Sequence, residues 1–241
     1  MFRVRLAVED PVPARIRVEG PAFHPLRVAR VAPREEVEVF DGRGHAWAAT
    51  VESVGDDHAV LSLGARRTED AGRRVLLLQG LPKGEKLDWL LQKTTELGVA
   101  GVWPLALARS VVKLRPDVAG KRRTRWQRIA EEAARQSGRA DVPEVGPLRT
   151  LEEALAALPP GVQLLVLDEE ERERRLSEAA AADGRPLALV IGPEGGLERA
   201  EVEQVRRAGG QAVTLGRHVL RTETVGLVAL AIVRHRDGLL G

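Results

Sequence analysis

"LVIGPEGGLERAEVE" (residues 189–203) joins a short apolar run to an acidic segment through Gly-Pro-Glu-Gly-Gly. The apolar run is typical of a buried strand, and the acidic segment is typical of a helix. Gly192, Gly195 and Gly196 allow a ligand to approach the backbone closely, and Pro193 stiffens the turn. Considered alone, the loop is more simply explained as an ordinary strand-to-helix turn. It has neither the Gly-Lys-Ser/Thr nor the Gly-x-Gly-x-x-Gly spacing of phosphate-binding loops.

The chain around this loop alternates strand-like and helix-like runs from Val75 onward, which is typical of a parallel α/β sheet. We predict strands over 75–80, 101–107, 162–168, 187–192 and 211–216, and helices over 83–98, 121–138, 151–158 and 197–210. A last helix is expected to begin near Thr222, which is a suitable N-cap. Its centre, residues 225–233, has almost no polar face, so it must be enclosed by its own domain, by a second subunit or by both.

Before Val75, the apolar residues recur with a different spacing. Residues 1 to about 66 contain short runs of alternating apolar and polar residues, separated by turn signals such as Asp-Gly. Several short strands at this spacing predict a small β-barrel. The polar segment 64–74 is interpreted as a linker. The sequence thus predicts two domains, residues 1–68 and residues 73–241.

Three predicted strands of the second domain end in unusual loops: at Leu167 and Asp168, at residues 192–196, and at residues 215–224. Ligands bind beyond the carboxyl ends of the strands in open parallel sheets. The three loops are therefore expected to build one pocket. Arg221 lies at this pocket, directly before the buried helix, and is either a site residue or surface decoration, with neither reading favoured by the pattern.

The composition excludes several kinds of site. Cysteine is absent from the 241 residues, which excludes disulfides, thiol nucleophiles and Cys-ligated metals. The five histidines show no metal-ligand spacing, and we expect no metal. No apolar run approaches the length of a membrane span, and residue 1 leads into polar sequence, so we expect a cytoplasmic protein without a membrane segment.

The positive charges are clustered, although the net charge is only +2. Eight bases against a single acid lie between Arg109 and Arg128, and a second basic stretch covers residues 1–34. Such patches favour contact with a polyanion. An arginine-rich composition is also common in thermostable proteins, so the number of arginines alone does not indicate contact with a polyanion.

"IGPEGGL" (191–197), followed by "LGRHVLRTETVGLVAL" (215–230), closely resembles the RsmE family of SPOUT-class ribosomal RNA methyltransferases. The resemblance extends to "GEKLDWLLQKTTELGV" (84–99), "RSVVKL" (109–114), "RWQRIAEEAARQSGRADVPEV" (125–145) and "AFHPLRVARVAPREEVEVFDGRG" (22–44). Departures occur at Arg135, where an acidic residue is common, and at His24-Pro25. Neither departure touches the two long motifs.

The resemblance implies an α/β fold with an N-terminal small PUA-like β-barrel that binds RNA and a C-terminal SPOUT α/β domain with a trefoil knot. It also implies a homodimer and the methylation of N3 of a uridine in 16S ribosomal RNA, on naked RNA or on the assembled small ribosomal subunit. The implied cofactor is S-adenosyl-L-methionine, held mainly through backbone groups by Leu167, Gly192, Glu194, Gly196, Leu215, Gly216, Val219, Leu220 and Thr222.

Methylation at N3 needs a base, or a cation that stabilises the developing uridine anion. Arg221 is our candidate for the electrostatic or phosphate-anchoring role, and Glu223 is our candidate for proton handling; the alternative is that both belong to a helix cap. The candidate RNA contacts are Arg3, Arg5, Arg27, Arg30, Lys86, Lys93, Arg109, Gln136 and Arg139.

Two other functions are considered. The basic patches alone would suit a non-catalytic RNA-binding or ribosome-assembly factor. A nucleotide-phosphate enzyme could use the glycine loop, but it would lack the usual lysine and metal-binding acids.

Overall fold

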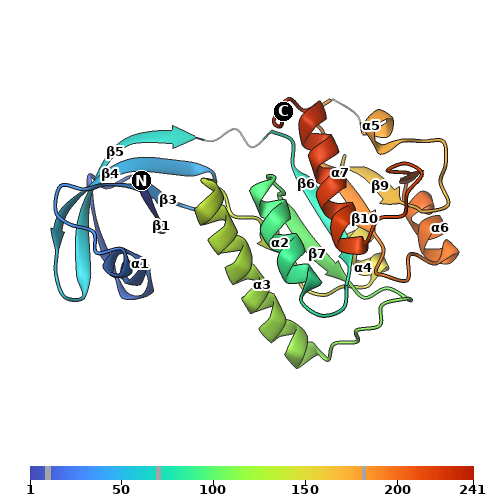
Figure 1. Cartoon of the computed structure of the whole chain (residues 1–241), viewed down its shortest axis with the longest axis horizontal. Coiled ribbons are helices and arrows are strands. Elements are labelled where there is room, and N and C mark those ends of the chain that lie inside the picture. The colour runs from blue at the N-terminus through green and yellow to red at the C-terminus, as the bar shows by residue number, and fades with distance from the viewer. Residues whose placement is uncertain (9–11, 69–71, 181–182) are drawn as a thin grey trace. The chain divides into compact units, whose positions relative to one another are not determined.

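The computed structural model describes residues 1–8, 12–68, 72–180 and 183–241. The chain forms two compact units, one made of Met1–Ala71 with Ala134–Val142 and the other of Gly72–Ala133 with Pro143–Gly241 (Figure 1). The first unit thus includes the end of a long helix that the sequence analysis assigned wholly to the second domain. The domain bounds 1–68 and 73–241 stay a prediction.

The first unit is built on a mixed five-stranded sheet in the order β1-β3-β4-β5-β2. Its strands are β1 Phe2–Arg5, β2 Arg15–Glu19, β3 Glu36–Phe40, β4 His45–Val54 and β5 His58–Thr68. β1 pairs with β3 in parallel, and the other pairs are antiparallel. Alternate residues of β4, such as Trp47, Ala49 and Val51, are buried, as expected for strands with one face on a core. The expected small β-domain is therefore present, as an open half-barrel.

Two features of this unit differ from the sequence analysis. Phe23–Val28 forms a helix, α1, preceded by a 3₁₀ turn at Gly20–Ala22, because Phe23 and Leu26 lie one helical turn apart and are both buried. β5 continues through Thr68, so the first part of the expected linker at 64–74 is strand. Residues 69–71 of that linker lie outside the described residues.

The second unit contains a six-stranded sheet in the order β11-β9-β10-β6-β7-β8, with every neighbouring pair parallel. The strands are β6 Val75–Gly80, β7 Gly101–Leu105, β8 Glu144–Val145, β9 Gln163–Leu167, β10 Leu187–Ile191 and β11 Gln211–Val213. Every residue of β6 and β10 is buried. Central parallel strands are covered on both faces, which is why these strands are continuous apolar runs.

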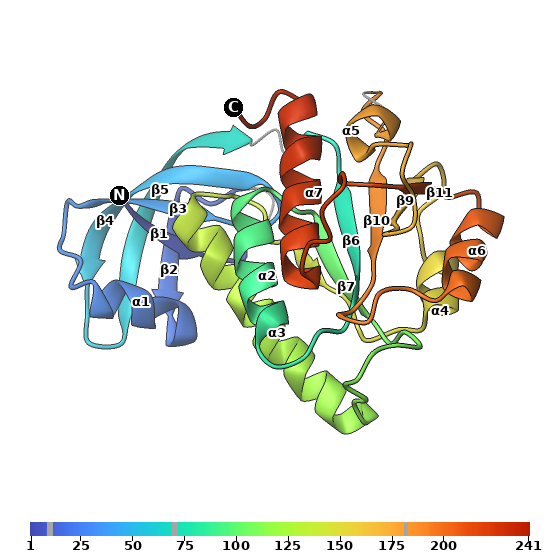
Figure 2. The ribbon, with the colours of Figure 1, turned by 45° about the vertical axis from the view of Figure 1, so that its right-hand side comes forward.

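Helices cover both faces of this sheet (Figure 2). They are α2 Lys86–Glu96, α3 Pro116–Ser137, α4 Leu151–Ala156, α5 Leu176–Ala179, α6 Arg199–Arg207 and α7 Thr222–Arg236. One core cluster joins the sheet to α2, α3, α5 and α7, and a second joins its other face to α4 and α6. Among the described residues, no helix is both long enough and apolar enough to cross a bilayer.

The sheet order puts β9 between β11 and β10, so the carboxyl ends of these three strands are adjacent. The chain leaves all three ends through the loops singled out in the sequence. The topology therefore brings those loops to one edge of the sheet.

Candidate active site

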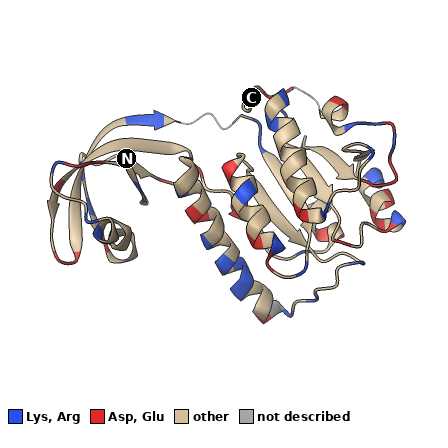
Figure 3. Ribbon diagram, in the orientation of Figure 1, with Lys and Arg blue, Asp and Glu red and all other residues tan. Residues whose placement is uncertain are grey.

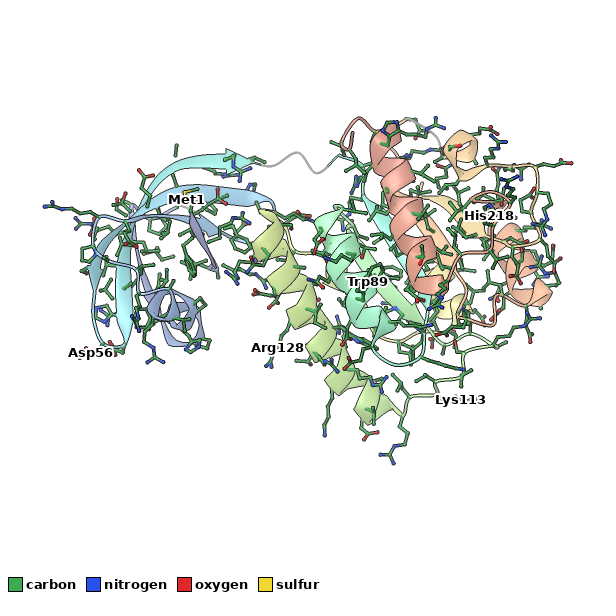
Figure 4. All side chains as sticks on the ribbon, in the orientation of Figure 1. Met1, Asp56, Trp89, Lys113, Arg128 and His218 are labelled. Atoms are coloured by element: carbon green, nitrogen blue, oxygen red, sulfur yellow. The ribbon has the colours of Figure 1, made fainter. Side chains whose placement is uncertain are left out.

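A cavity of about 400 Å³ lies at this edge of the sheet. The loops after β9, β10 and β11 and the start of α7 line it; in Figure 4, His218 marks the loop after β11. All the residues expected to hold a cofactor line this one cavity: Leu167, Gly192, Glu194, Gly196, Leu215, Gly216, Val219, Leu220 and Thr222.

The glycines of the site are required by close backbone packing. A Cβ atom on Gly80, at the end of β6, would lie 2.6 Å from the Pro193 nitrogen and 2.9 Å from the Gly192 carbonyl carbon. A Cβ atom on Gly192 would lie 2.9 Å from the carbonyl carbon of Gly196. Gly196 has a φ of +72°, which a residue with a side chain rarely adopts. The loop is therefore folded tightly on itself and against β6, and its backbone faces the cavity.

Thr222 is not the N-cap that the sequence analysis predicted. Arg221 occupies the N-cap position, and Thr222 is the first residue of α7. The Thr222 hydroxyl instead donates a hydrogen bond of 2.6 Å to the Gly192 carbonyl oxygen, because the glycine loop lies against the start of the helix. The hydroxyl also accepts a hydrogen bond of 2.8 Å from the side-chain amide of Gln79 in β6.

Gln79 is a site residue that the sequence analysis missed. Its side chain is fully buried, and it links β6, α7 and, through Thr222, the glycine loop. The available signal was a single amide in the apolar strand "VLLLQG", since a buried polar group needs hydrogen-bond partners. We infer that Gln79 positions the loop rather than contacting a ligand, because it does not line the cavity.

A second link joins the loop after β9 to α6. The carboxylate of Asp168 accepts hydrogen bonds of 2.6 and 2.8 Å from the guanidinium of Arg199. Burial raises the pKa of Asp168, but the Arg199 guanidinium and the Glu170 backbone N–H outweigh it and lower the pKa on balance. Asp168 therefore stays ionised at neutral pH and ties the loop after β9 to α6, the helix that follows the glycine loop.

The two candidate catalytic residues lie at the start of α7. Arg221 lines the cavity and is exposed; among the described residues, no carboxylate lies within ion-pair distance of it. Glu223 does not line the cavity, and its Oε2 atom lies 3.5 Å from Nζ of Lys86. The guanidinium of Arg221 is thus available to a substrate, and the Glu223 carboxylate lies next to the Lys86 ammonium.

The candidate RNA contacts fall into different environments. Arg3 pairs with Glu38 at 2.5 Å, and Arg139, which is 6% exposed, pairs with Asp141 at 2.6 Å. Arg109 donates a hydrogen bond of 3.0 Å to the Gly195 carbonyl oxygen, so it contacts the glycine loop. Four further candidates are exposed in the first unit: Arg5, Arg27, Arg30 and Gln136. The remaining two, Lys86 and Lys93, lie on α2. Lys86 pairs with Glu194 of the glycine loop, and Lys93 pairs with Glu96 of the same helix.

No group of three or more His, Asp or Glu side chains in the described part of the chain could hold a metal ion. The arrangement is instead a pocket of glycine-rich backbone that three arginines, Arg172, Arg217 and Arg221, also line.

Two family models match the chain. A model of an RNA methyltransferase domain matches residues 69–234, and a model of an RNA methyltransferase PUA domain matches residues 19–63. The curated relatives include two proteins named ribosomal RNA small subunit methyltransferase E. The one from Bacillus subtilis (strain 168) is 41% identical over 173 residues, covering 69% of this chain and 68% of that protein. The one from Mycobacterium tuberculosis (strain CDC 1551 / Oshkosh) is 36% identical over 219 residues, covering 88% and 82%.

Solved structures resemble the chain over almost its full length. A ribosomal RNA small subunit methyltransferase E from Neisseria gonorrhoeae, solved bound to S-adenosyl methionine, is 33% identical with a TM-score of 0.86, covering 98% of this chain and 97% of that one. A methyltransferase from Legionella pneumophila, solved with the cofactor SAM bound, is 25% identical with a TM-score of 0.83, covering 97% of both chains.

Proposed function

Because this chain belongs to the RNA methyltransferase family, we propose that it transfers a methyl group from S-adenosylmethionine to N3 of a uridine in 16S ribosomal RNA. The observation that carries the proposal is the convergence of three loops, with all the expected cofactor residues, on one cavity. The solved relative from Neisseria gonorrhoeae, with S-adenosyl methionine bound, supports the choice of cofactor.

The cavity suits this cofactor. Its volume of about 400 Å³ lies within the range of roughly 300–1,000 Å³ that is usual for small-molecule sites. The backbone of the glycine loop approaches the cavity without side chains, so its N–H and C=O groups would hold the ligand's polar groups. When bound, S-adenosylmethionine supplies a methyl group on a sulfonium sulfur, which leaves as a neutral thioether when N3 takes the methyl group.

The residues at the start of α7 supply the rest of the chemistry. Uridine N3 carries a proton and becomes a good nucleophile only when that proton leaves. The exposed guanidinium of Arg221 stabilises the negative charge that develops on the base, and the carboxylate of Glu223 receives the proton. Positioning of the two reactants supplies much of the rate.

The first half of α3 is the part of the second unit best suited to RNA phosphates. By helical spacing, Lys121, Arg125 and Arg128 share one face, and Arg122 lies beside it. Figure 3 shows Lys and Arg (blue) gathered along this half of α3. Arg125 is paired with Asp88 at 2.5 Å, whereas Lys121, Arg122 and Arg128 have no carboxylate within ion-pair distance among the described residues. We call Lys121, Arg122 and Arg128 the α3 basic strip and propose that it contacts the RNA backbone.

Replacing all three residues of the α3 basic strip with alanine is expected to weaken RNA binding and to flatten its salt dependence. Each lost phosphate contact reduces the slope of log K against log salt by about 0.7–0.9. Filter binding of ribosomal RNA at several salt concentrations measures the slope. The same substitutions at Arg206 and Arg207, on the exposed side of α6, should leave it unchanged. An unchanged slope in the α3 variant would remove the strip from the interface.

Three further parts of the proposal concern the whole protein. Three apolar residues of α7, Leu227, Val228 and Ala231, are only half-buried in the single chain. A second subunit would cover them, which supports the homodimer that the family resemblance implies. The resemblance also supports a trefoil knot around the loops that line the cavity. Methylation of ribosomal RNA, on the assembled small subunit, supports a cytoplasmic location.

The two alternatives have less support. The named relatives are methyltransferases, and the complete set of cofactor loops in one cavity gives no reason to prefer a non-catalytic assembly factor. A nucleotide-phosphate enzyme would need a lysine in the glycine loop, which is absent from "GPEGGLER".

The direct test is to incubate the protein and isotopically labelled S-adenosylmethionine with small ribosomal subunits from cells that lack this methylation. Mass spectrometry of the digested 16S ribosomal RNA is expected to place the label on N3 of one uridine. Cofactor binding in calorimetry without any methylation would favour the non-catalytic factor. Binding of ATP in place of S-adenosylmethionine would favour the nucleotide-phosphate enzyme.

A further inference from the structure

An ammonium group shared by two carboxylates lies at the rim of the cavity. Lys86 is the first residue of α2, and its Nζ donates a hydrogen bond of 2.8 Å to Oε1 of Glu194 in the glycine loop. The same Nζ lies 3.5 Å from Oε2 of Glu223, in the first turn of α7. Lys86 therefore connects three elements that meet at the cavity.

The two carboxylates differ in how many partners they have. Oε1 of Glu194 also accepts a hydrogen bond of 3.0 Å from the Lys83 backbone N–H. The Glu223 side chain is only 15% exposed, and its Oε2 atom is buried with no hydrogen-bond partner among the described residues. Lys86 is thus the nearby cation that compensates the charge of Glu223. A carboxylate that loses such a cation becomes easier to protonate.

The charges of the group follow from these contacts. The hydrogen bond to Glu194 raises the pKa of Lys86, although burial lowers it. Burial raises the pKa of Glu194, but Lys86 and the Lys83 N–H outweigh it and lower the pKa on balance. Lys86 therefore stays protonated and cannot serve as a base. Its ammonium is also engaged, which argues against the RNA contact expected from the sequence.

We propose that Lys86 is a positioning residue that holds the Glu223 carboxylate in place and compensates its charge, through an ammonium shared with Glu194 of the glycine loop. The inference rests on the proposed function, in which the N3 proton moves to the Glu223 carboxylate and then to solvent. An ionised Glu223 is needed for that transfer, because only the carboxylate form accepts a proton. Lys86 acts through Glu223 and does not touch the reacting atoms.

The test is the pH profile of turnover on small ribosomal subunits at saturating S-adenosylmethionine. A carboxylate that loses a nearby cation accepts a proton at a higher pH. The acidic limb of the Lys86→Met profile is therefore expected to move at least about one pH unit upward. Activity would be lost as pH falls and regained as pH rises. Lys86→Arg, which keeps the charge, is expected to restore the wild-type profile.

Two further variants separate this role from a structural one. Arg206→Met removes an exposed ion pair with Glu203 on α6 and should leave the profile unchanged. Glu223→Gln should lower turnover roughly 10²–10⁴-fold, and adding Lys86→Met to it should cause no further shift of the limb. A Lys86→Met enzyme that is slower by the same factor at every pH would overturn the inference. If the wild-type protein methylates nothing at any pH, it is the proposed function that fails.

Discussion

Gly80→Ala is expected to weaken S-adenosylmethionine binding by roughly ten- to a hundredfold, which corresponds to the 1–3 kcal/mol that overpacking costs. The added methyl group would lie 2.6 Å from the Pro193 nitrogen and 2.7 Å from its Cδ atom. These atoms belong to the backbone and ring of the glycine loop, so no side-chain rotation relieves the overlap. Gly80 does not have a positive φ, so its backbone conformation would accept alanine. The expected effect therefore comes from steric overlap alone.

Calorimetry with S-adenosylmethionine measures this effect, and thermal unfolding shows whether the protein still folds. Gly120→Ala is the matched control, because Gly120 lies in α3 with a negative φ and no atom within 4 Å of an added Cβ. That control should bind the cofactor normally and gain about 0.5–1 kcal/mol of stability. A folded Gly80→Ala protein with wild-type affinity would show that the glycine loop does not hold the cofactor.

Arg221→Ala is expected to reduce turnover by about 10²–10³-fold while changing cofactor affinity by less than about tenfold. Its guanidinium is exposed at the cavity and has no carboxylate partner among the described residues, so it is free to stabilise the uridine anion. Its backbone carbonyl accepts the first N–H bonds of α7, from Thr224 at 2.8 Å and Val225 at 2.9 Å, and alanine keeps these bonds. The helix should therefore still form.

Single-turnover methylation of small subunits separates the chemical step from cofactor binding. Arg221→Lys should recover part of the rate, because it restores the charge but not the planar fork of donors. Arg236→Ala, at the other end of α7, should retain wild-type turnover. Full activity in Arg221→Ala would exclude the residue from the electrostatic role.

Much of the second unit was predictable because its signals are local. The strands β6, β9 and β10 are short apolar runs followed by turn residues, and the helices have regular periods. Helix boundaries were less predictable: α3 begins at Pro116, ahead of the expected start at residue 121, and α1 was missed. A six-residue helix among strands has too few turns for its period to stand out.

The loops that line the cavity could be predicted from the sequence. The hydrogen bonds and ion pairs that hold those loops could not. The rule for parallel sheets places the loops after neighbouring strands together, and the family motifs indicated which residues line the pocket. The partners of Thr222, Glu194 and Glu223 were not predictable, because each lies far away in the chain. Gln79 is 143 residues from Thr222, and Lys86 is 108 residues from Glu194.

The amino-acid pattern alone established the class of fold, the absence of thiol chemistry and the three loops that end neighbouring strands. It also carried the motifs that indicate an RNA methyltransferase. The packing of the folded chain was needed to show which side chains are engaged: Thr222 bonds to the glycine loop instead of capping its helix, and Lys86 pairs with two carboxylates. This difference arises because periodicity and turn residues act over a few positions, whereas hydrogen bonds and ion pairs depend on how distant segments pack.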